Sequence, residues 1–201
     1  IIFVQVALTN GLGKSIQEIT KPRSDGDQKY DSATFYSISN CQEGLSRVTL
    51  GNFLIKRVVF EIQEELPNIK HFGTLSPIPG FRDWFSYLED VKIKNILGEV
   101  PIDNISFLKS SDLKVGDPRI VANKVAITKL VAHYLMNEKN HKQLPINDVC
   151  RFHLGNGAII DDIIINANVS EVGLNRSFGV MVNYLYELKN IEKNHEEYIN
   201  N

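Results

Sequence analysis

Two polar side chains could carry out proton-transfer chemistry: Ser76 in the segment TLSPIPGF and His153 in the segment RFHLGNGA. A histidine changes its charge near neutral pH and therefore suits the delivery or removal of a proton. A serine next to proline is nevertheless more often a turn residue. A histidine between Phe152 and Leu154 is more often a packed, hydrogen-bonded side chain. Taken singly, neither residue establishes a catalytic site.

A third feature is a strand, loop and helix in succession, with the loop ending at Gly51. The start of a helix leaves about four backbone N–H groups unpaired, and together with the helix dipole they suit an anion such as pyrophosphate. Gly51 would let a ligand approach the backbone closely, and Arg47 would add positive charge. The segment matches neither the Walker loop nor the Gly-x-Gly-x-x-Gly pattern. A helix that merely packs is therefore the more common interpretation of this signal.

The first half of the chain contains the elements that would position these residues. We expect strands at 1–8 and 33–40, a short helical piece before residue 20, and an exposed loop at 21–31. Residues 52–66 form an amphipathic helix that Pro67 ends. The segment 71–81 reads as a strand broken by two prolines. The apolar positions of the amphipathic helix are Leu54, Ile55, Val58, Val59, Ile62 and Leu66.

The second half is expected to continue this alternation. FRDWFSYLED (81–90) looks helical and 91–116 is a mixed connection. Asp117-Pro118 opens the clearest helix, with a cap and a first-turn proline, and NEKNHK (137–142) ends it. Asn147 or Asp148 caps a short helix that holds His153. Residues 158–169 and 178–186 read as strands, and the tail is helical or frayed. Interleaved strands and helices indicate an α/β or α+β class.

Composition narrows the class of protein. The chain has 201 residues, 43% hydrophobic and 23% charged, with a formal net charge of -2, which fits a single domain with a real core. We expect no nucleic-acid partner, because no basic face stands out, and no membrane span. The first residues, IIFVQVAL, read as a buried strand rather than a signal peptide. Cys41 and Cys150 are too few for a disulfide framework and have no metal-ligand spacing, so a reducing compartment is expected.

Several segments together resemble malonyl-CoA decarboxylases. The acyl-CoA-binding strand, loop and helix of that family resemble residues 35–68, FYSISNCQEGLSRVTLGNFLIKRVVFEIQEELPN. The family's serine motif is similar to TLSPIPGF (74–81), and its histidine motif to RFHLGNGA (151–158). The C-terminal end of the bacterial-type members resembles VNYLYELKNIEKNHEEY (182–198). The segments occur in the family's order over nearly the whole chain, which makes the resemblance specific.

The resemblance implies a fold, an oligomeric state and a location in the cell. Residues 1–201 are expected to form the catalytic domain, an acetyltransferase (GNAT)-like mixed sheet flanked by helices. We expect that the family's helical N-terminal domain is not part of this sequence and that the catalytic domain is truncated at its N-terminus. At full length the protein is expected to be a homo-oligomer. The expected location is the cytoplasm, or the mitochondrial matrix or peroxisome in a eukaryote.

The resemblance also implies an activity, the carboxy-lyase conversion of malonyl-CoA to acetyl-CoA and carbon dioxide. No cofactor or metal is expected, because the substrate's thioester can take up the electrons of the broken bond as an enolate. Ser76 and His153 match the catalytic pair, the serine as proton acceptor and the histidine as donor, although such a pair can pass a proton either way. Tyr186 matches a tyrosine near the same site. The acyl-CoA is expected to contact Ser46, Arg47, Val48, Thr49, Leu50, Gly51 and Asn52, together with Ser76 and His153.

One strand departs from the family pattern, which usually reads Arg-Leu-Asn-Trp-x-x-Asp after the histidine motif. Here the sequence from 162 to 168 is DIIINAN, so Asp162 replaces an arginine, and Ile164 and Ile165 replace an Asn-Trp pair. Contacts near His153 are therefore expected to differ, with a slower reaction or an altered substrate if the lost asparagine oriented the ring. Two alternatives stay open: a GNAT-like acyl-CoA acyltransferase and a non-catalytic acyl-CoA-binding remnant.

Overall fold

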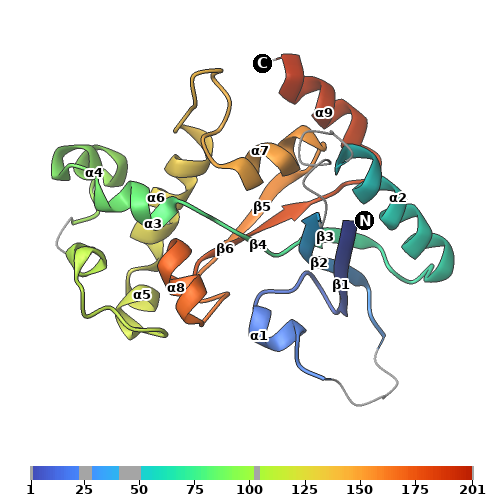
Figure 1. Cartoon of the computed structure of the whole chain (residues 1–201), viewed down its shortest axis with the longest axis horizontal. Coiled ribbons are helices and arrows are strands. Elements are labelled where there is room, and N and C mark those ends of the chain that lie inside the picture. The colour runs from blue at the N-terminus through green and yellow to red at the C-terminus, as the bar shows by residue number, and fades with distance from the viewer. Residues whose placement is uncertain (1, 23–28, 41–50, 102–104, 201) are drawn as a thin grey trace. The chain divides into compact units, whose positions relative to one another are not determined.

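The computed structural model describes residues 2–22, 29–40, 51–101 and 105–200 (Figure 1). The chain divides into two compact units. The first unit contains residues 1–76, 152–162 and 183–201, and the second contains 77–151 and 163–182. The strands of the described residues form a mixed sheet in the order β1-β2-β3-β6-β4, and β5 also pairs with β6. The expected α/β class, a mixed sheet with helices, is confirmed.

The first unit is built on three neighbouring strands, β1 (Ile2–Thr9), β2 (Ser32–Asn40) and β3 (His71–Thr74). β1 and β2 are antiparallel, with Thr9 opposite Ser32, and the register shifts between Gln5 and Val6. β2 and β3 are parallel, with Phe35 opposite Thr74. β6 (Met181–Leu185) then pairs antiparallel with β3 through Gly73 and Leu185. The strands predicted at 1–8 and 33–40 are thus confirmed.

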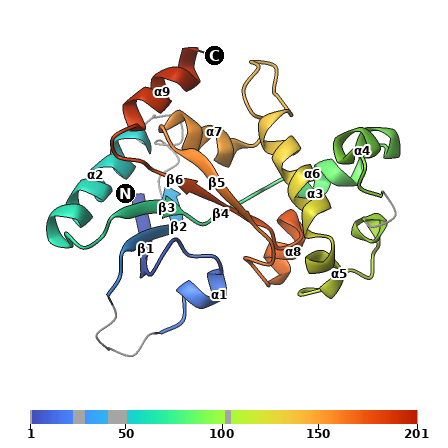
Figure 2. The ribbon, with the colours of Figure 1, turned by 180° about the vertical axis from the view of Figure 1, so that it is seen from behind.

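Helices of the first unit follow the predicted pattern. α1 (Ile16–Ile19) is the short piece before residue 20, and α2 (Gly51–Glu65) is the amphipathic helix, ending before Pro67. Ile55 and Val59 of α2 are buried, as their spacing requires. The tail forms α9 (Ile191–Asn200), which lies beside α2 in both views (Figures 1 and 2). Lys56 of α2 and Glu192 of α9 form an ion pair of 3.8 Å.

The second unit is mainly helical. Its core includes the rings of Phe81, Phe85 and Phe178, which meet edge to face at 5.8 to 5.9 Å between centroids. Such aromatic pairs add about 0.5–1.5 kcal/mol to the area they bury. Its helices are α3 (Phe81–Ser86), α4 (Asp90–Leu97), a 3₁₀ turn (Ser106–Lys109), α5 (Pro118–Ala122), α6 (Lys124–Met136) and α8 (Glu171–Ser177).

Two expectations for this unit need correction. The helix expected from Asp117 is divided into α5 and α6 by Asn123, although Asp117 caps α5 by accepting a hydrogen bond from the Arg119 N–H. The segment expected as a mixed connection contains α4, whose Ile93 and Leu97 are buried one turn apart. Four-residue spacing of two apolar side chains is a short signal, and it was insufficient to predict that helix.

The remaining strands are shorter than predicted. β5 (Ile159–Ile164) ends early because the chain turns at Asn166, which has a φ of 55°. β6 begins at Met181 rather than 178, because Phe178 and Gly179 have φ values of 56° and 78° after α8. Asparagine and glycine tolerate this left-handed backbone, whereas a phenylalanine in it is uncommon. No helix within the described ranges is long and apolar enough to cross a membrane.

Candidate active site

Ser76 and His153 form a buried hydrogen-bonded pair in the first unit. The Ser76 Oγ lies 3.0 Å from the His153 Nε2, and the side chains are 6% and 3% exposed respectively. The other ring nitrogen, Nδ1, lies 2.8 Å from the hydroxyl of Tyr186. A hydroxyl, an imidazole and a phenol are therefore linked in a row, with both nitrogens of the imidazole occupied.

Ser76 begins a short strand of the mixed sheet. It opens the two-residue strand β4 (Ser76–Pro77) directly after β3, where the Leu75 N–H donates to the Phe35 carbonyl at 2.9 Å. Pro77 has no N–H, so the ladder cannot continue regularly past the serine. The strand predicted over 71–81 is thus broken at Leu75 rather than at a proline, and it ends with the pair Ser76 and Pro77.

His153 is placed by both ends of α7 (Asp148–Gly155). Asn147 caps the helix start, where its Oδ1 accepts a 2.8 Å hydrogen bond from the Cys150 N–H, as predicted. After the helix the chain turns at Gly157, whose φ is 78°. A Cβ at this position would lie 2.1 Å from the carbonyl oxygen of Ile191, so only glycine fits. The glycine of the histidine motif thus lets the start of α9 pack directly against the turn that follows α7.

Burial controls the charge of this site. It lowers the pKa of His153 from 6.5 to about 3 and raises the pKa of Tyr186 above its usual value. The imidazole also stacks on the ring of Tyr184, with centroids 4.4 Å apart and planes 24° apart. At neutral pH the free site therefore holds an uncharged imidazole and an un-ionised phenol. A neutral imidazole carries one N–H, so one nitrogen donates and the other accepts.

Such a row of groups can pass a proton between its members. The Ser76 hydroxyl can give its proton to an acceptor in front of it and take another from Nε2. The ring is held from both sides, because Ser76 and Tyr186 fix its nitrogens and Tyr184 covers its face. A positioned acid or base of this kind contributes about 10²–10⁴ to a reaction rate.

Comparison with known proteins assigns the family. The family model described as "Malonyl-CoA decarboxylase C-terminal domain" matches residues 1–201. The chain belongs to the malonyl-CoA decarboxylase family. It is 37% identical to the mitochondrial malonyl-CoA decarboxylase of Rattus norvegicus, covering 99% of this chain and 45% of that protein. The corresponding protein of Anser anser anser is 36% identical, with 44% of its length covered. The chain thus spans less than half the length of these curated relatives.

Solved structures agree with this assignment. The malonyl-CoA decarboxylase from Rhodopseudomonas palustris superposes with a TM-score of 0.88 at 38% identity, over 99% of this chain and 46% of that one. The loading GNATL domain of CurA from Lyngbya majuscula gives a TM-score of 0.52 at 12% identity, over 94% of this chain and 70% of that one. The second likeness concerns the fold alone, and it supports the expected GNAT-like architecture.

The segment predicted to bind acyl-CoA is only partly described. Ser46, Arg47, Val48, Thr49 and Leu50 lie outside the described residues, as does Cys41. β2 ends at Asn40 and Gly51 and Asn52 begin α2, so the predicted strand and the predicted helix on either side of this segment are present. Contact between this segment and acyl-CoA stays a prediction.

The divergent strand of this malonyl-CoA decarboxylase homologue has its own contacts. Asp162, where the family usually has arginine, forms an ion pair with Lys14 at 3.2 Å. Both side chains are well exposed, so the pair contributes at most about 1 kcal/mol. The orientation of His153 does not depend on the lost asparagine, because Ser76 and Tyr186 already occupy its ring nitrogens.

Sequence reasoning missed three buried residues around the pair: Thr74, Asn183 and Tyr184. Thr74 lies two positions before Ser76, and Tyr184 lies two positions before Tyr186. In extended backbone, residues two apart point to the same side. That spacing could have identified both residues. Asn183 could have been identified as a polar residue within an apolar strand, because a buried amide requires partners.

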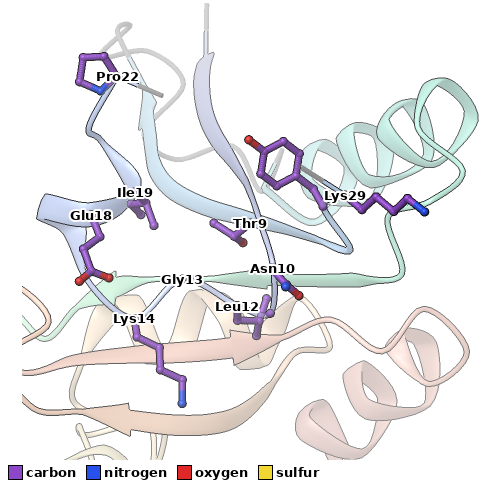
Figure 3. A pocket seen from close by; sticks show the side chains of 11 residues that line it. Thr9, Asn10, Leu12, Gly13, Lys14, Glu18, Ile19, Pro22 and Lys29 are labelled. Atoms are coloured by element: carbon purple, nitrogen blue, oxygen red, sulfur yellow. The ribbon is translucent and has the colours of Figure 1, made fainter. Parts of the chain in front are cut away.

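A separate hollow of about 940 Å³ lies around the β1–α1 loop (Figure 3). Thr9 and Asn10 line it from the end of β1, and Glu18 and Ile19 line it from α1. The Lys14 ammonium at its edge is the partner of Asp162. None of Ser76, His153 and Tyr186 is among the described residues that line this hollow.

Proposed function

We propose that the protein carrying this chain decarboxylates malonyl-CoA to acetyl-CoA and carbon dioxide. The single observation that carries the proposal is the buried contact of 3.0 Å between Ser76 and His153, in a chain of the malonyl-CoA decarboxylase family. Tyr186 completes the site by holding the far side of the imidazole.

The reaction needs one bond broken and one proton supplied. The bond between the carboxylate carbon and the α-carbon of the malonyl group breaks, and carbon dioxide leaves. The electron pair moves into the adjacent thioester as an enolate. A proton then adds to the α-carbon and gives acetyl-CoA. Because the thioester accepts the electron pair, we propose that the reaction proceeds without a cofactor.

His153 and Ser76 would supply that proton as a relay. The free imidazole is neutral because it is desolvated, but a bound malonyl carboxylate brings a negative charge that favours the imidazolium, whose additional proton is taken up from solvent. The Ser76 hydroxyl gives its proton to the α-carbon while Nε2–H gives its own to Ser76. The enolate is thereby neutralised, the serine is restored and the imidazole becomes neutral again.

The remaining parts of the proposal concern substrate binding, the oligomeric state and the location in the cell. The segment from Ser46 to Asn52 would hold the coenzyme A portion of the substrate, with the start of α2 as an anion site. At full length the protein would form a homo-oligomer. It would act in the cytoplasm, or in the mitochondrial matrix or peroxisome of a eukaryote. The mitochondrial relatives support a mitochondrial location in the eukaryotic case.

The test is an assay of the purified full-length protein with malonyl-CoA, measuring carbon dioxide and acetyl-CoA. We expect equimolar release of both, and a fall of about 10²–10⁴ in kcat for Ser76→Ala. Ser32→Ala is the matched control, because Ser32 is also buried in the first unit but donates to Asp31 at 2.7 Å instead. Its kcat is expected to match that of the wild type.

Two results would reject the proposal. One is tight binding of malonyl-CoA without release of either product, which would indicate an acyl-CoA-binding protein. The other is transfer of the acyl group to an added amine or thiol in preference to release of acetyl-CoA, which would indicate an acyltransferase.

A further inference from the structure

Thr74 extends the row of hydrogen-bonded groups beyond Ser76. Its side chain is 1% exposed, and its Oγ1 lies 2.8 Å from the Ser76 Oγ. The backbone N–H of Tyr184 donates to the same Oγ1 at 3.3 Å. Thr74 therefore links the catalytic serine to β6, the strand that carries Tyr184 and ends one residue before Tyr186.

The backbone around Thr74 is fixed from both sides. The Asn183 side-chain amide donates to the Thr74 carbonyl at 2.6 Å and to the Gly13 carbonyl at 3.1 Å. On the other side, Thr74 is paired with Phe35 of β2. Tyr184 thus contacts both ends of the row from Thr74 to His153, because its N–H donates to Thr74 and its ring stacks on His153. This gives Thr74 Oγ1 a defined position relative to the Ser76 hydroxyl.

The protons in this row can be arranged in two ways. In one, Ser76 donates to His153 Nε2, and the imidazole donates from Nδ1 to Tyr186. In the other, Tyr186 donates to Nδ1, Nε2–H donates to the Ser76 Oγ, and Ser76 donates to Thr74 Oγ1. The first arrangement leaves the phenol proton of Tyr186 without an acceptor within this row. The second leaves the hydroxyl proton of Thr74 without an acceptor within this row. A phenol is a stronger donor than an aliphatic hydroxyl, so the second arrangement is favoured.

We propose that Thr74 is a positioning residue that sets the direction of proton transfer in the pair. Its hydroxyl oxygen accepts the Ser76 proton, which leaves a Ser76 lone pair facing the Nε2–H of His153. Once the imidazole is protonated, the Ser76 hydroxyl turns from Thr74 to the α-carbon and gives up its proton, while Nε2–H passes to the Ser76 oxygen and the imidazolium returns to the neutral imidazole. This inference rests on the proposed decarboxylation and assigns a residue that acts through Ser76.

The test compares Thr74→Val with Thr74→Ser and with Thr34→Val. Thr34 is a matched control: it is equally buried, and its Oγ1 accepts from the Gly13 N–H at 2.8 Å rather than touching Ser76. We expect kcat for malonyl-CoA to fall about tenfold in Thr74→Val with KM changed less than about twofold. Thr74→Ser should restore kcat, and Thr34→Val should keep it.

A double-mutant cycle separates positioning from a purely structural role. In a Ser76→Ala background the Thr74→Val substitution should change the residual rate less than about twofold, because its effect passes through the serine hydroxyl. A further tenfold loss in that background would overturn the proposal. So would an unchanged kcat in the single variant.

A second measurement does not depend on activity, and it separates this inference from the proposed decarboxylation. The ¹⁵N NMR shifts of the His153 ring report which nitrogen carries the proton. We expect the proton on Nε2 in the wild type, and a shift of the population toward Nδ1 in Thr74→Val but not in Thr34→Val. A wild-type tautomer distribution in Thr74→Val would contradict the role of Thr74, whether or not the protein releases carbon dioxide.

Discussion

The burial of His153 predicts a specific dependence of stability on pH. Its pKa is about 3 in the folded protein and about 6.5 in an unfolded chain. Between these two values the unfolded state binds one more proton than the folded state, so the free energy of unfolding falls as pH falls. The full difference of about 3.5 pKa units corresponds to roughly 5 kcal/mol, comparable to the lower end of total domain stability. Between pH 7 and pH 5 the loss is about 2 kcal/mol.

The assay is urea unfolding of the wild type and of His153→Gln at pH 7 and pH 5. The variant is expected to be less stable at pH 7, because glutamine cannot make both ring contacts, but its pH dependence should be smaller by about 2 kcal/mol. His141→Gln, which removes an exposed histidine instead, should keep the wild-type dependence. An equal loss of stability on acidification in His153→Gln and the wild type would refute the reasoning.

Three further outcomes follow from the same structure. Tyr186→Phe removes the partner of Nδ1 and should lower kcat about tenfold, checked by steady-state kinetics with malonyl-CoA. Gly157→Ala should cost about 2–4 kcal/mol of unfolding free energy, measured in urea, because its Cβ would meet the Ile191 carbonyl at 2.1 Å. Lys14→Met should change the melting temperature by only a few degrees, because the Lys14–Asp162 pair is exposed and worth less than about 1 kcal/mol.

Local sequence signals predicted much of the fold. The spacing of Ile55 and Val59 predicted the helix α2, and Pro67 predicted where that helix ends. The Asp117 cap was predicted correctly, but the break at Asn123 was not. The break was not predicted because the apolar pattern continues across it. The early end of β5 depends on the left-handed conformation of Asn166, which a run of isoleucines does not reveal.

Prediction of the site required more than local sequence signals. Ser76 and His153 were identified by their resemblance to family motifs, since each alone suits a turn or a packed position. Their 3.0 Å contact depends on the sheet bringing together segments 77 positions apart. Thr74 was not predicted, because the hydroxyl becomes relevant only once its distance to Ser76 is known. The contact between Ser76 and His153 arises from tertiary packing, and no periodicity in the sequence encodes it. The two-residue spacing of Thr74 and Ser76 indicates only that they share a side of the strand.

The most direct test of the central claim is the single-turnover rate of acetyl-CoA formation from malonyl-CoA by the full-length protein and by His153→Gln. The relay of His153 and Ser76 predicts a fall of about 10²–10⁴ in that rate, with binding of acetyl-CoA by calorimetry changed less than about threefold. An unchanged single-turnover rate in His153→Gln, in a variant that still folds and binds acetyl-CoA, would contradict the claim that this imidazole supplies the proton.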